Sequence, residues 1–348
     1  MGQAAGKKGA ELGADFLGDL AHRATRRILL GGQGREVRTD RVVTADGAGA
    51  AATAVASSFR EKIDAGRFVM SVEVDPPHGI KPQKAVAGAR LLQEAGIDAI
   101  NVGDSPTAKV RMSPLAMSVL LKQELAVDIV MHYTTRDRNA LAIHSDMIGA
   151  HALGIRNILC LRGDPPSLGG YTDIVGVWDI SAVGLIRFLK LANDGVDFAG
   201  KSIAGKADFF IGASANLNAE PMETEVRLMR RKVEAGCHFF VTQNVFDASV
   251  LERFLDKTAK FKRPIMIGVL PLHNSRHAEF LHAEVPGMNL PDDVRERMRR
   301  AGDEKGPREG QAMARDLLAL VKERAAGAYL VPSFGRYDIV AELVAEVR

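Results

Sequence analysis

Hydrophobic and polar residues alternate in blocks along most of this chain, and the blocks follow two periods. From residue 68 onward, short apolar runs rich in β-branched and aromatic residues are separated by stretches in which apolar positions recur at helical spacing. The runs expected to be strands are Phe68–Val74, Ala99–Gly103, Asp128–Thr134, Asn157–Leu161, Phe209–Ala213, His238–Gln243, Ile265–Leu270 and Ala328–Val331. The stretches expected to be helices include Ala85–Ala95, Ala140–Ala152, Val177–Asn193, Glu223–Ala235, Ser249–Lys260 and Gly310–Arg324. Glycines expected to act as helix stops are Gly96, Gly154, Gly236 and Gly327.

Strands that alternate with helices indicate repeated strand–helix units and a parallel sheet. Eight units in about 280 residues match the size and strand number of a TIM barrel. The alternative is an open doubly wound sheet, which usually carries a Gly-x-Gly-x-x-Gly turn after its first strand. The turn here is Asp75-Pro76-Pro77-His78-Gly79, which lacks that spacing. The sequence therefore predicts an α/β fold, a (β/α)8 TIM barrel over residues 58–348.

Residues 1–57 follow a different pattern. Leu12, Phe16 and Leu20 recur at helical spacing, and residues 42–57 contain almost only small side chains. We expect an amphipathic helix on an Ala/Gly-rich linker. This helix either docks on a partner subunit or a second copy of the chain, or packs on the flank of its own barrel, or is partly disordered.

Composition narrows the class of protein. The chain is 46% apolar and 26% charged, enough for one large core, and its net charge of +3 comes from 46 basic and 43 acidic residues spread along its length. No basic stripe of the kind that binds nucleic acid is present. Cys160 and Cys237 offer neither a disulfide framework nor a thiolate metal site. No apolar segment approaches the roughly 20 residues of a membrane span, and the amino terminus lacks the apolar core of a secretory signal. We expect a cytoplasmic protein without a membrane or nucleic-acid partner.

Polar residues stand where the predicted strands end, which is the ligand-binding face of a TIM barrel. Glu73 lies among apolar neighbours, which raise the pKa of a carboxyl group and suit it to general-acid catalysis. The alternative is a glutamate held by an arginine or lysine across the barrel. The fourth strand breaks into Arg162-Gly163-Asp164 before two prolines, which is either an active-site loop or a surface turn with a solvated ion pair.

Two further strand ends carry polar side chains. His132 follows the third strand and is either functional or a core histidine; no His-Glu-x-x-His spacing accompanies it, so no metal is expected. Gln243 ends the sixth strand and offers a donor and an acceptor to a heterocycle, or is tied to a loop backbone. Carboxylates, amides and arginines without a paired nucleophile and base favour chemistry performed by a cofactor.

Six motifs carry a resemblance to a known family. They are Ser71-Val72-Glu73-Val74-Asp75-Pro76-Pro77, His132-Tyr133-Thr134, Leu161-Arg162-Gly163-Asp164, Arg231-Lys232-Val233-Glu234-Ala235-Gly236, Thr242-Gln243 with Phe246-Asp247, and Gly268-Val269-Leu270-Pro271. In their order and spacing, residues 65–348 resemble the methylenetetrahydrofolate reductase family, especially the reductase half of homocysteine S-methyltransferase/methylenetetrahydrofolate reductase fusion proteins. The resemblance implies a TIM barrel with FAD across its carboxyl face. It also implies hydride transfer from NADH or NADPH through FAD to 5,10-methylenetetrahydrofolate, giving 5-methyltetrahydrofolate, or the reverse.

The same resemblance implies residue roles. Glu73 is the expected general acid that opens the folate imidazolidine ring to the iminium, Asp164 the charge that stabilises this cation, and Gln243 a pterin ligand. Expected flavin contacts are Asn101, His132, Leu161, Arg162, Gly163, Asp164, Trp178, Glu225 and Lys232. Expected further substrate contacts are His277, Leu281 and Arg336.

The chain departs from the family pattern around the expected flavin and folate sites. Asp75 and His78 flank the prolines where aromatic residues and an arginine are common, and Val177 or Trp178 replaces a tyrosine near the flavin. These changes predict that FAD is weakly bound.

His277 and Leu281 stand where some members have a glutamine and a phenylalanine that meet folate and nicotinamide. Loss of that aromatic ring removes a stacking platform worth about 1 kcal/mol. The electron donor is therefore either a reduced nicotinamide or a partner redox protein. Two other functions stay open: a tetrahydrofolate-dependent methyltransferase on the same barrel, and a non-catalytic folate- or flavin-binding subunit of a redox complex.

Overall fold

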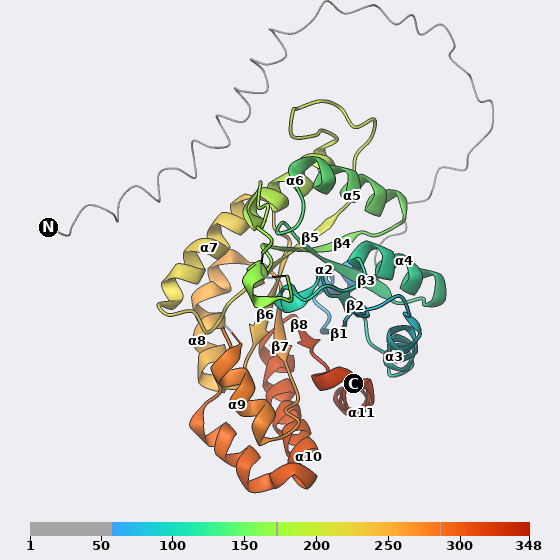
Figure 1. Cartoon of the computed structure of the whole chain (residues 1–348). Coiled ribbons are helices and arrows are strands. Elements are labelled where there is room, and N and C mark those ends of the chain that lie inside the picture. Colours follow the sequence, from blue (N-terminus) through green and yellow to red (C-terminus); the bar gives the residue numbers. More distant parts are fainter. Residues whose placement is uncertain (1–57, 172, 286) are drawn as a thin grey trace, which may run out of the picture. The chain divides into compact units, whose positions relative to one another are not determined.

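The computed structural model describes residues 58–171, 173–285 and 287–348 (Figure 1). The helix and linker expected within residues 1–57 lie outside the described residues. The strands are β1 (Val69–Val74), β2 (Ala99–Val102), β3 (Asp128–Thr134), β4 (Asn157–Leu161), β5 (Phe210–Ala215), β6 (Phe239–Asn244), β7 (Ile265–Val269) and β8 (Gly327–Leu330). The α-helices are α2 (Ser58–Asp64), α3 (Gln83–Glu94), α4 (Pro114–Glu124), α5 (Ala140–Ala152), α6 (Ala182–Asp194), α7 (Met222–Glu234), α8 (Ala248–Thr258), α9 (Ser275–Glu284), α10 (Asp292–Arg324) and α11 (Tyr337–Val347).

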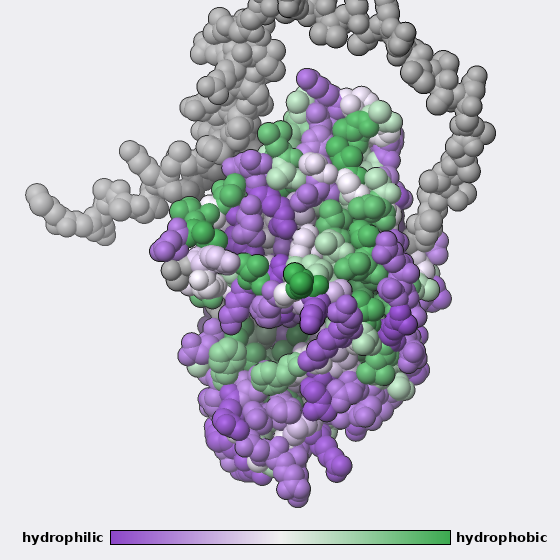
Figure 2. Space-filling view, turned by 45° about the vertical axis from the view of Figure 1, so that its right-hand side comes forward, coloured by the Kyte–Doolittle hydropathy of each residue, from purple (hydrophilic) through white to green (hydrophobic). Residues whose placement is uncertain are grey.

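These strands form a closed parallel barrel in the order β1 to β8, with β8 paired to β1. The prediction of a TIM barrel is confirmed. Helices α3 to α11 surround the barrel, and Figure 2 shows an outer face on which hydrophilic and hydrophobic residues are mixed. Within the described residues, no helix combines the length and apolar composition needed to cross a membrane.

The alternation of side chains along β1 decides which of its residues point into the barrel. Val69 belongs to the cluster that fills the barrel interior, whereas Met70 and Val72 belong to the larger cluster between strands and helices. Because successive residues of a strand face opposite sides, Ser71 and Glu73 point inward with Val69. Glu73 is thus placed at the carboxyl end of the barrel interior.

A short helix that the sequence did not predict closes the opposite end. Phe59 of α2 packs edge-on against Phe210 and Phe239, with ring centroids 6.3 and 5.9 Å away. The backbone N–H of Phe59 and the hydroxyl of Ser58 both donate to Asp128, the first residue of β3, at 2.7 and 2.8 Å. Helix α2 therefore fills the amino end of the barrel.

The structure confirms the eight predicted strands, with bounds that shift by at most two residues, but corrects several boundaries. Helix α6 begins at Ala182, capped by the Ser181 hydroxyl, so residues 177–180 of the predicted helix Val177–Asn193 lie in a loop. Gly327 opens β8 and is no helix stop, whereas Gly96, Gly154 and Gly236 do follow helices with positive φ. The helix predicted at Gly310–Arg324 begins at Asp292 and is broken at Gly302.

Candidate active site

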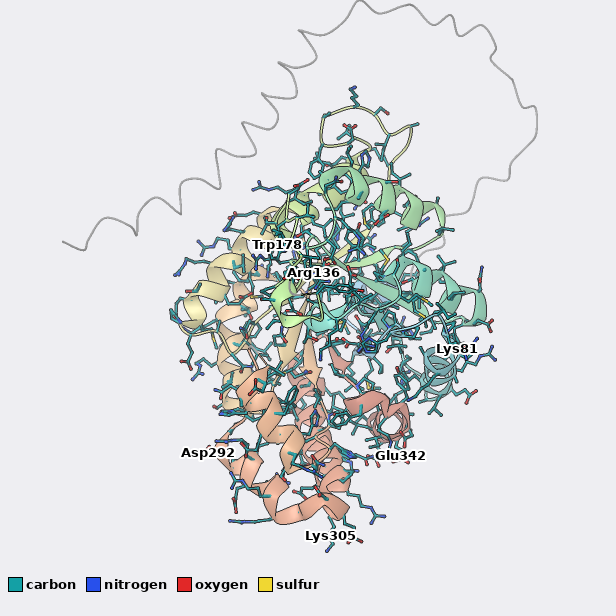
Figure 3. All side chains as sticks on the ribbon, in the orientation of Figure 1. Lys81, Arg136, Trp178, Asp292, Lys305 and Glu342 are labelled. Carbon is teal, nitrogen blue, oxygen red and sulfur yellow. The ribbon has the colours of Figure 1, made fainter. Side chains whose placement is uncertain are left out.

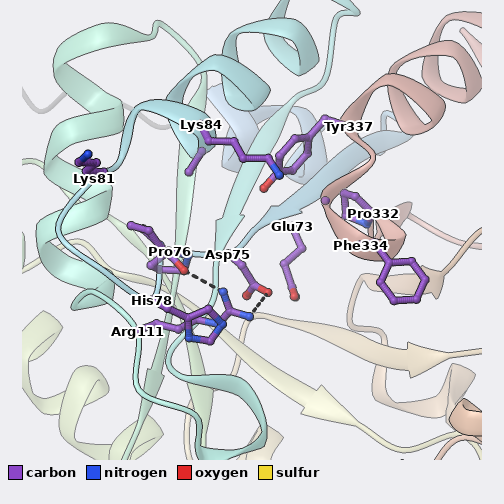
Figure 4. A pocket seen from close by; sticks show the side chains of 13 residues that line it. Glu73, Asp75, Pro76, His78, Lys81, Lys84, Arg111, Pro332, Phe334 and Tyr337 are labelled. Carbon is purple, nitrogen blue, oxygen red and sulfur yellow. Dashed lines mark hydrogen bonds and ion pairs between the residues drawn. The ribbon is translucent and has the colours of Figure 1, made fainter.

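A cavity of about 510 Å³ opens at the carboxyl end of β1 (Figure 4). Its walls come from the end of β1, the start of α3, the loop after β2 and the loop between β8 and α11. The residues that line it are Glu73, Asp75, Pro76, Pro77, His78, Lys81, Lys84, Ala85, Arg111, Pro332, Phe334, Gly335 and Tyr337. We call it the Glu73 cavity.

Two carboxyl groups share the floor of this cavity. Burial, followed by the charge of Asp75, raises the pKa of Glu73 to about 8, although the charge of Arg111 lowers it in part. Arg111 pairs with Asp75 (Nη2 to Oδ2, 3.2 Å) and donates to the carbonyl of Pro76 at 2.9 Å. The arginine pairs with the neighbour of Glu73, and burial, the largest cause of the raised pKa, keeps the proton on Glu73 near neutral pH. This is the protonation state that a general acid requires.

The backbone of the loop after β2 is shaped to hold Asp75. A Cβ at Gly103 would lie 2.7 Å from Asp75 Oδ1, so a larger residue there would displace the carboxylate. Asp75 Oδ1 is buried and has no hydrogen-bond partner among the described residues. Burial also raises the pKa of Asp75. The loop after β2 therefore packs closely on Asp75, whose Oδ1 is left without a hydrogen-bond partner among the described residues.

The upper wall of the cavity is aromatic and its rim is cationic. Tyr337 packs on Gly88 of α3, where a Cβ would lie 2.2 Å from the tyrosine ring. Burial, then the charges of Asp75 and Glu73, raise the pKa of Tyr337 to about 12, so its hydroxyl stays neutral. Exposed Lys81 and Lys84 line the same cavity. The arrangement suits a ligand with a flat ring and an anionic tail.

The predicted Arg-Gly-Asp loop lies elsewhere on the carboxyl face. The guanidinium of Arg162 lies 4.4 Å above the ring of Trp178, whose Nε1 donates to the Arg162 carbonyl at 3.0 Å. Asp164 Oδ2 accepts the backbone N–H of Thr107 at 2.7 Å. The loop after β4 therefore rests on the loop after β2, and Asp164 does not line the Glu73 cavity.

Gly163 allows this loop to pass close to the loop after β3. Its φ is +85°, and a Cβ there would lie 2.8 Å from the Cβ of Arg136. Arg136 is buried and donates towards the carbonyls of Ser105 and Asp164. Figure 3 shows Arg136 and Trp178 close together at the mouth of the barrel. Leu161, the last residue of β4, packs on the interior cluster.

Four other expected flavin contacts are buried. His132 Nε2 lies 3.2 Å from Asn101 Oδ1, and burial lowers the pKa of His132 to about 4, so the imidazole is neutral. Glu225 and Lys232 of α7 lie 3.5 Å apart (Oε1 to Nζ), and Lys232 donates to the Ser214 carbonyl at 2.6 Å. These side chains mainly contact protein atoms.

The expected substrate contacts are dispersed. Gln243 is exposed near the carboxyl end of β6, where the register of β6 with β7 shifts between Val241 and Asn244. His277 and Leu281 of α9 are 9% and 6% exposed.

Arg336 pairs with Asp338 at 2.6 Å on the surface of the loop before α11. Its neighbours Gly335 and Tyr337 line the Glu73 cavity, whereas Arg336, Gln243, His277 and Leu281 do not.

The residues expected to hold a flavin fit that role unequally. Asn101 Nδ2 is buried without a hydrogen-bond partner among the described residues, and Arg162 and Asp164 reach the surface at the mouth. These three, with the Gly163 backbone, offer the donors and acceptor that a flavin ring and phosphate need. Lys232 would have to leave the Ser214 carbonyl to reach a phosphate.

Comparison with known proteins decides the family. A family model described as methylenetetrahydrofolate reductase matches residues 58–337. The chain belongs to the methylenetetrahydrofolate reductase family. The closer likeness to the fusion proteins stays a prediction.

The relatives that this chain resembles are distant, and each match covers only part of both proteins. The chain is similar to methylenetetrahydrofolate reductase (NADH) 1 of Arabidopsis thaliana, 25% identical over 49% of this chain and 30% of that protein. It is also similar to a probable methylenetetrahydrofolate reductase (NADPH) of Caenorhabditis elegans, 27% identical over 57% of this chain and 28% of that protein. The match to 5,10-methylenetetrahydrofolate reductase of Pectobacterium carotovorum is 24% identical over 46% of this chain and 49% of that protein. The chain thus matches half or less of the length of these relatives.

Solved structures support the fold. A Clostridium thermocellum protein that binds two copies of 5-methyl-5,6,7,8-tetrahydrofolic acid superimposes with a TM-score of 0.59 at 13% identity, over 83% of this chain and 98% of that one. An F420-dependent secondary alcohol dehydrogenase superimposes with a TM-score of 0.52 at 13% identity, over 81% of this chain and 99% of that one. At these identities the likeness concerns the barrel alone.

Most of the residues that line the Glu73 cavity were not predicted from the sequence. Asp75 stands two residues after Glu73, so strand alternation alone could have placed the two carboxyl groups on one side. Arg111, Phe334 and Tyr337 come from loops and a helix start whose positions depend on the folded barrel. Only the polar spacing at β1 was available as a signal.

Proposed function

We propose that this protein is a folate-dependent oxidoreductase that interconverts 5,10-methylenetetrahydrofolate and 5-methyltetrahydrofolate. Membership of the methylenetetrahydrofolate reductase family supports the substrate class. The observation that carries the proposal is the place of Glu73 at the floor of a cavity on the carboxyl face of the barrel, where burial raises its pKa to about 8. A carboxylic acid that keeps its proton near pH 7 can protonate a ring nitrogen as a carbon–nitrogen bond opens.

In the proposed mechanism, Glu73 donates its proton to the nitrogen that leaves the methylene carbon of the folate imidazolidine ring. The ring opens to a cationic iminium, and a hydride added to that carbon gives the methyl group. Asp164, which lies on the same face but outside the lining of the Glu73 cavity, stays the predicted charge that stabilises the cation. The cationic rim formed by Lys81 and Lys84 suits the carboxylates of the folate tail.

The hydride comes from NADH or NADPH in this proposal, since relatives are named for both donors. Asn101, Arg162, Gly163 and Asp164 would hold FAD, and a bound FAD would supply the hydride-carrying chemistry between nicotinamide and folate. Because Lys232 pairs with Glu225 and donates to the Ser214 carbonyl of the barrel, we expect this flavin to bind weakly. Gln243 and Arg336 stay predicted pterin and tail ligands.

Anaerobic turnover of the purified full-length protein tests this function. The protein is mixed with 5,10-methylenetetrahydrofolate and NADH or NADPH, with and without added FAD, and 5-methyltetrahydrofolate is measured by mass spectrometry. We expect product with at least one donor, and an absorbance spectrum that reports whether flavin is retained. Absence of product in every combination, together with no oxidation of 5-methyltetrahydrofolate, would contradict the proposal. Methyl transfer to tetrahydrofolate without nicotinamide turnover would instead favour a methyltransferase.

A further inference from the structure

The loop between β8 and α11 holds Phe334 in a backbone conformation that its side chain disfavours. Its φ is 57° and its ψ is 25°, in the left-handed region where non-glycine residues are uncommon. The ring is 70% exposed, so burial within the barrel does not compensate for this conformation. A strained residue that gains little core packing points to a functional contact.

Neighbouring residues fix this conformation from both sides. The Ser333 hydroxyl donates to the Pro271 carbonyl at 2.5 Å, which ties the loop to the end of β7. Gly335 also has a positive φ of 67°, and its N–H donates to Pro332 at 3.3 Å. The loop therefore presents the Phe334 ring at a defined position.

The ring lies against two histidines on the side towards α9. Its centroid is 4.8 Å from that of His277 and 5.5 Å from that of His273. Burial, then the charge of His273, lowers the pKa of His277 to about 4, so this ring is neutral at pH 7 and supports an aromatic contact. Leu281 stands where some family members are expected to have the aromatic platform. It packs in a buried cluster with Leu270, Leu272 and Ala278.

Phe334 also lines the Glu73 cavity, where Figure 4 shows Glu73 between Asp75 and Phe334. We propose that Phe334 is the aromatic platform on which a planar heteroaromatic ring stacks in the Glu73 cavity. The ring is the pterin of a folate or the nicotinamide of a reduced dinucleotide. This inference rests on the proposed function, and it places the stacking residue on the β8–α11 loop rather than on α9.

Direct binding to the full-length protein tests the platform without requiring turnover. Dissociation constants for 5-methyltetrahydrofolate and for NADH and NADPH are measured by calorimetry with the wild type, Phe334→Leu, Phe334→Tyr and Phe334→Gly. We expect Phe334→Leu to raise the dissociation constant of one or more ligands roughly threefold to tenfold. Phe334→Tyr should bind the ligands like the wild type. Phe334→Gly should bind as weakly as Phe334→Leu and yet raise the Tm, because glycine adopts a φ of 57° without strain. Phe280→Leu on α9, whose side chain is 55% exposed and does not line the cavity, is the matched control and should change nothing.

The ligands distinguish the two rings. If Phe334→Leu lowers the affinity for folate and leaves the affinities for the dinucleotides unchanged, the platform binds the pterin. The opposite result assigns the platform to the nicotinamide. Equal affinities for every ligand in the wild type and Phe334→Leu would overturn the platform while leaving the proposed function intact. A wild type that binds no folate would overturn the proposed function and, with no dinucleotide bound either, the platform as well. A lower Tm in Phe334→Gly would show that the loop conformation serves stability and would also count against the platform.

Discussion

At the scale of single residues, the catalytic capacity of the Glu73 cavity depends on one proton. Glu73 and Asp75 repel each other when both are ionised, and Arg111, which forms its ion pair with Asp75, offsets this repulsion only in part. Two carboxyl groups in one buried site do not both ionise readily, so the proton stays on the deeper one. The folded chain therefore holds an acid at a pH where free glutamate is ionised.

We predict that Asp75→Asn narrows the pH range of activity. The charge of Asp75 raises the pKa of Glu73, so its removal lowers that pKa, and the acid loses its proton at a lower pH. The alkaline limb of the kcat/KM profile should move to lower pH, with a loss of roughly threefold to tenfold at pH 8. Asp256→Asn, an exposed residue of α8 that pairs with Arg324, is the control. An unmoved alkaline limb in Asp75→Asn would show that Asp75 does not tune the acid.

Stability should also depend on the Glu73 proton. Its pKa is about 8 in the folded chain against an ordinary value of 4.5, so the folded state binds the proton more tightly than the unfolded state. The stabilisation that the proton on Glu73 provides is fully present below pH 4.5 and is lost as pH rises through 8. Glu73→Gln removes this dependence on pH. We expect the free energy of unfolding of the variant to exceed that of the wild type by roughly 1–3 kcal/mol at pH 9. Urea unfolding at pH 5, 7 and 9 measures the difference, with exposed Glu61→Gln as the control; parallel curves for wild type and Glu73→Gln would refute it.

At the scale of elements, the packing of α3 on α11 sets the position of Tyr337 in the cavity wall. Gly88 is required there because a Cβ would meet the tyrosine ring at 2.2 Å. We predict that Gly88→Ala costs about 1–3 kcal/mol of unfolding free energy through overpacking and weakens folate binding. Gly149→Ala on α5 is a matched control, since nothing lies within 4 Å of its Cβ. That variant should be neutral or stabilised by up to about 1 kcal/mol. Equal unfolding free energies for the two variants would mean that Tyr337 moves without cost.

The helices and strands also show which parts of the fold could be predicted from the sequence. Strands such as β3 and β4 were predicted to the residue, because a buried strand in a parallel sheet is a short apolar run bounded by polar residues. Helix α6 was predicted too early because Val177 and Ile180 extend its apolar pattern, although the Ser181 cap begins the helix later. Glu73 was found from its apolar neighbours, whereas Phe334 could not be, since a left-handed backbone and a place in the cavity wall leave no local pattern.

At the scale of the whole molecule, the closed barrel and its covering helices lie within residues 58–348. Every strand of this barrel has two hydrogen-bonded neighbours, so no edge is left that needs another segment. The amino end is filled by Phe59 of α2, which is completely buried against Phe210 and Phe239. The barrel therefore carries its own plug at the start of the described residues.

We predict that a fragment of residues 58–348 folds and keeps the folate affinity of the full-length chain. Its far-ultraviolet circular dichroism and Tm should match those of the full chain, whereas a fragment of residues 69–348 should lose about 3–5 kcal/mol because it lacks the Phe59 side chain. Light scattering on both the full chain and the 58–348 fragment tests the partner role predicted for the N-terminal helix. A smaller assembly for the fragment, with folate binding intact, would assign residues 1–57 to association. Loss of folate binding in a folded 58–348 fragment would contradict the placement of the whole site on the barrel.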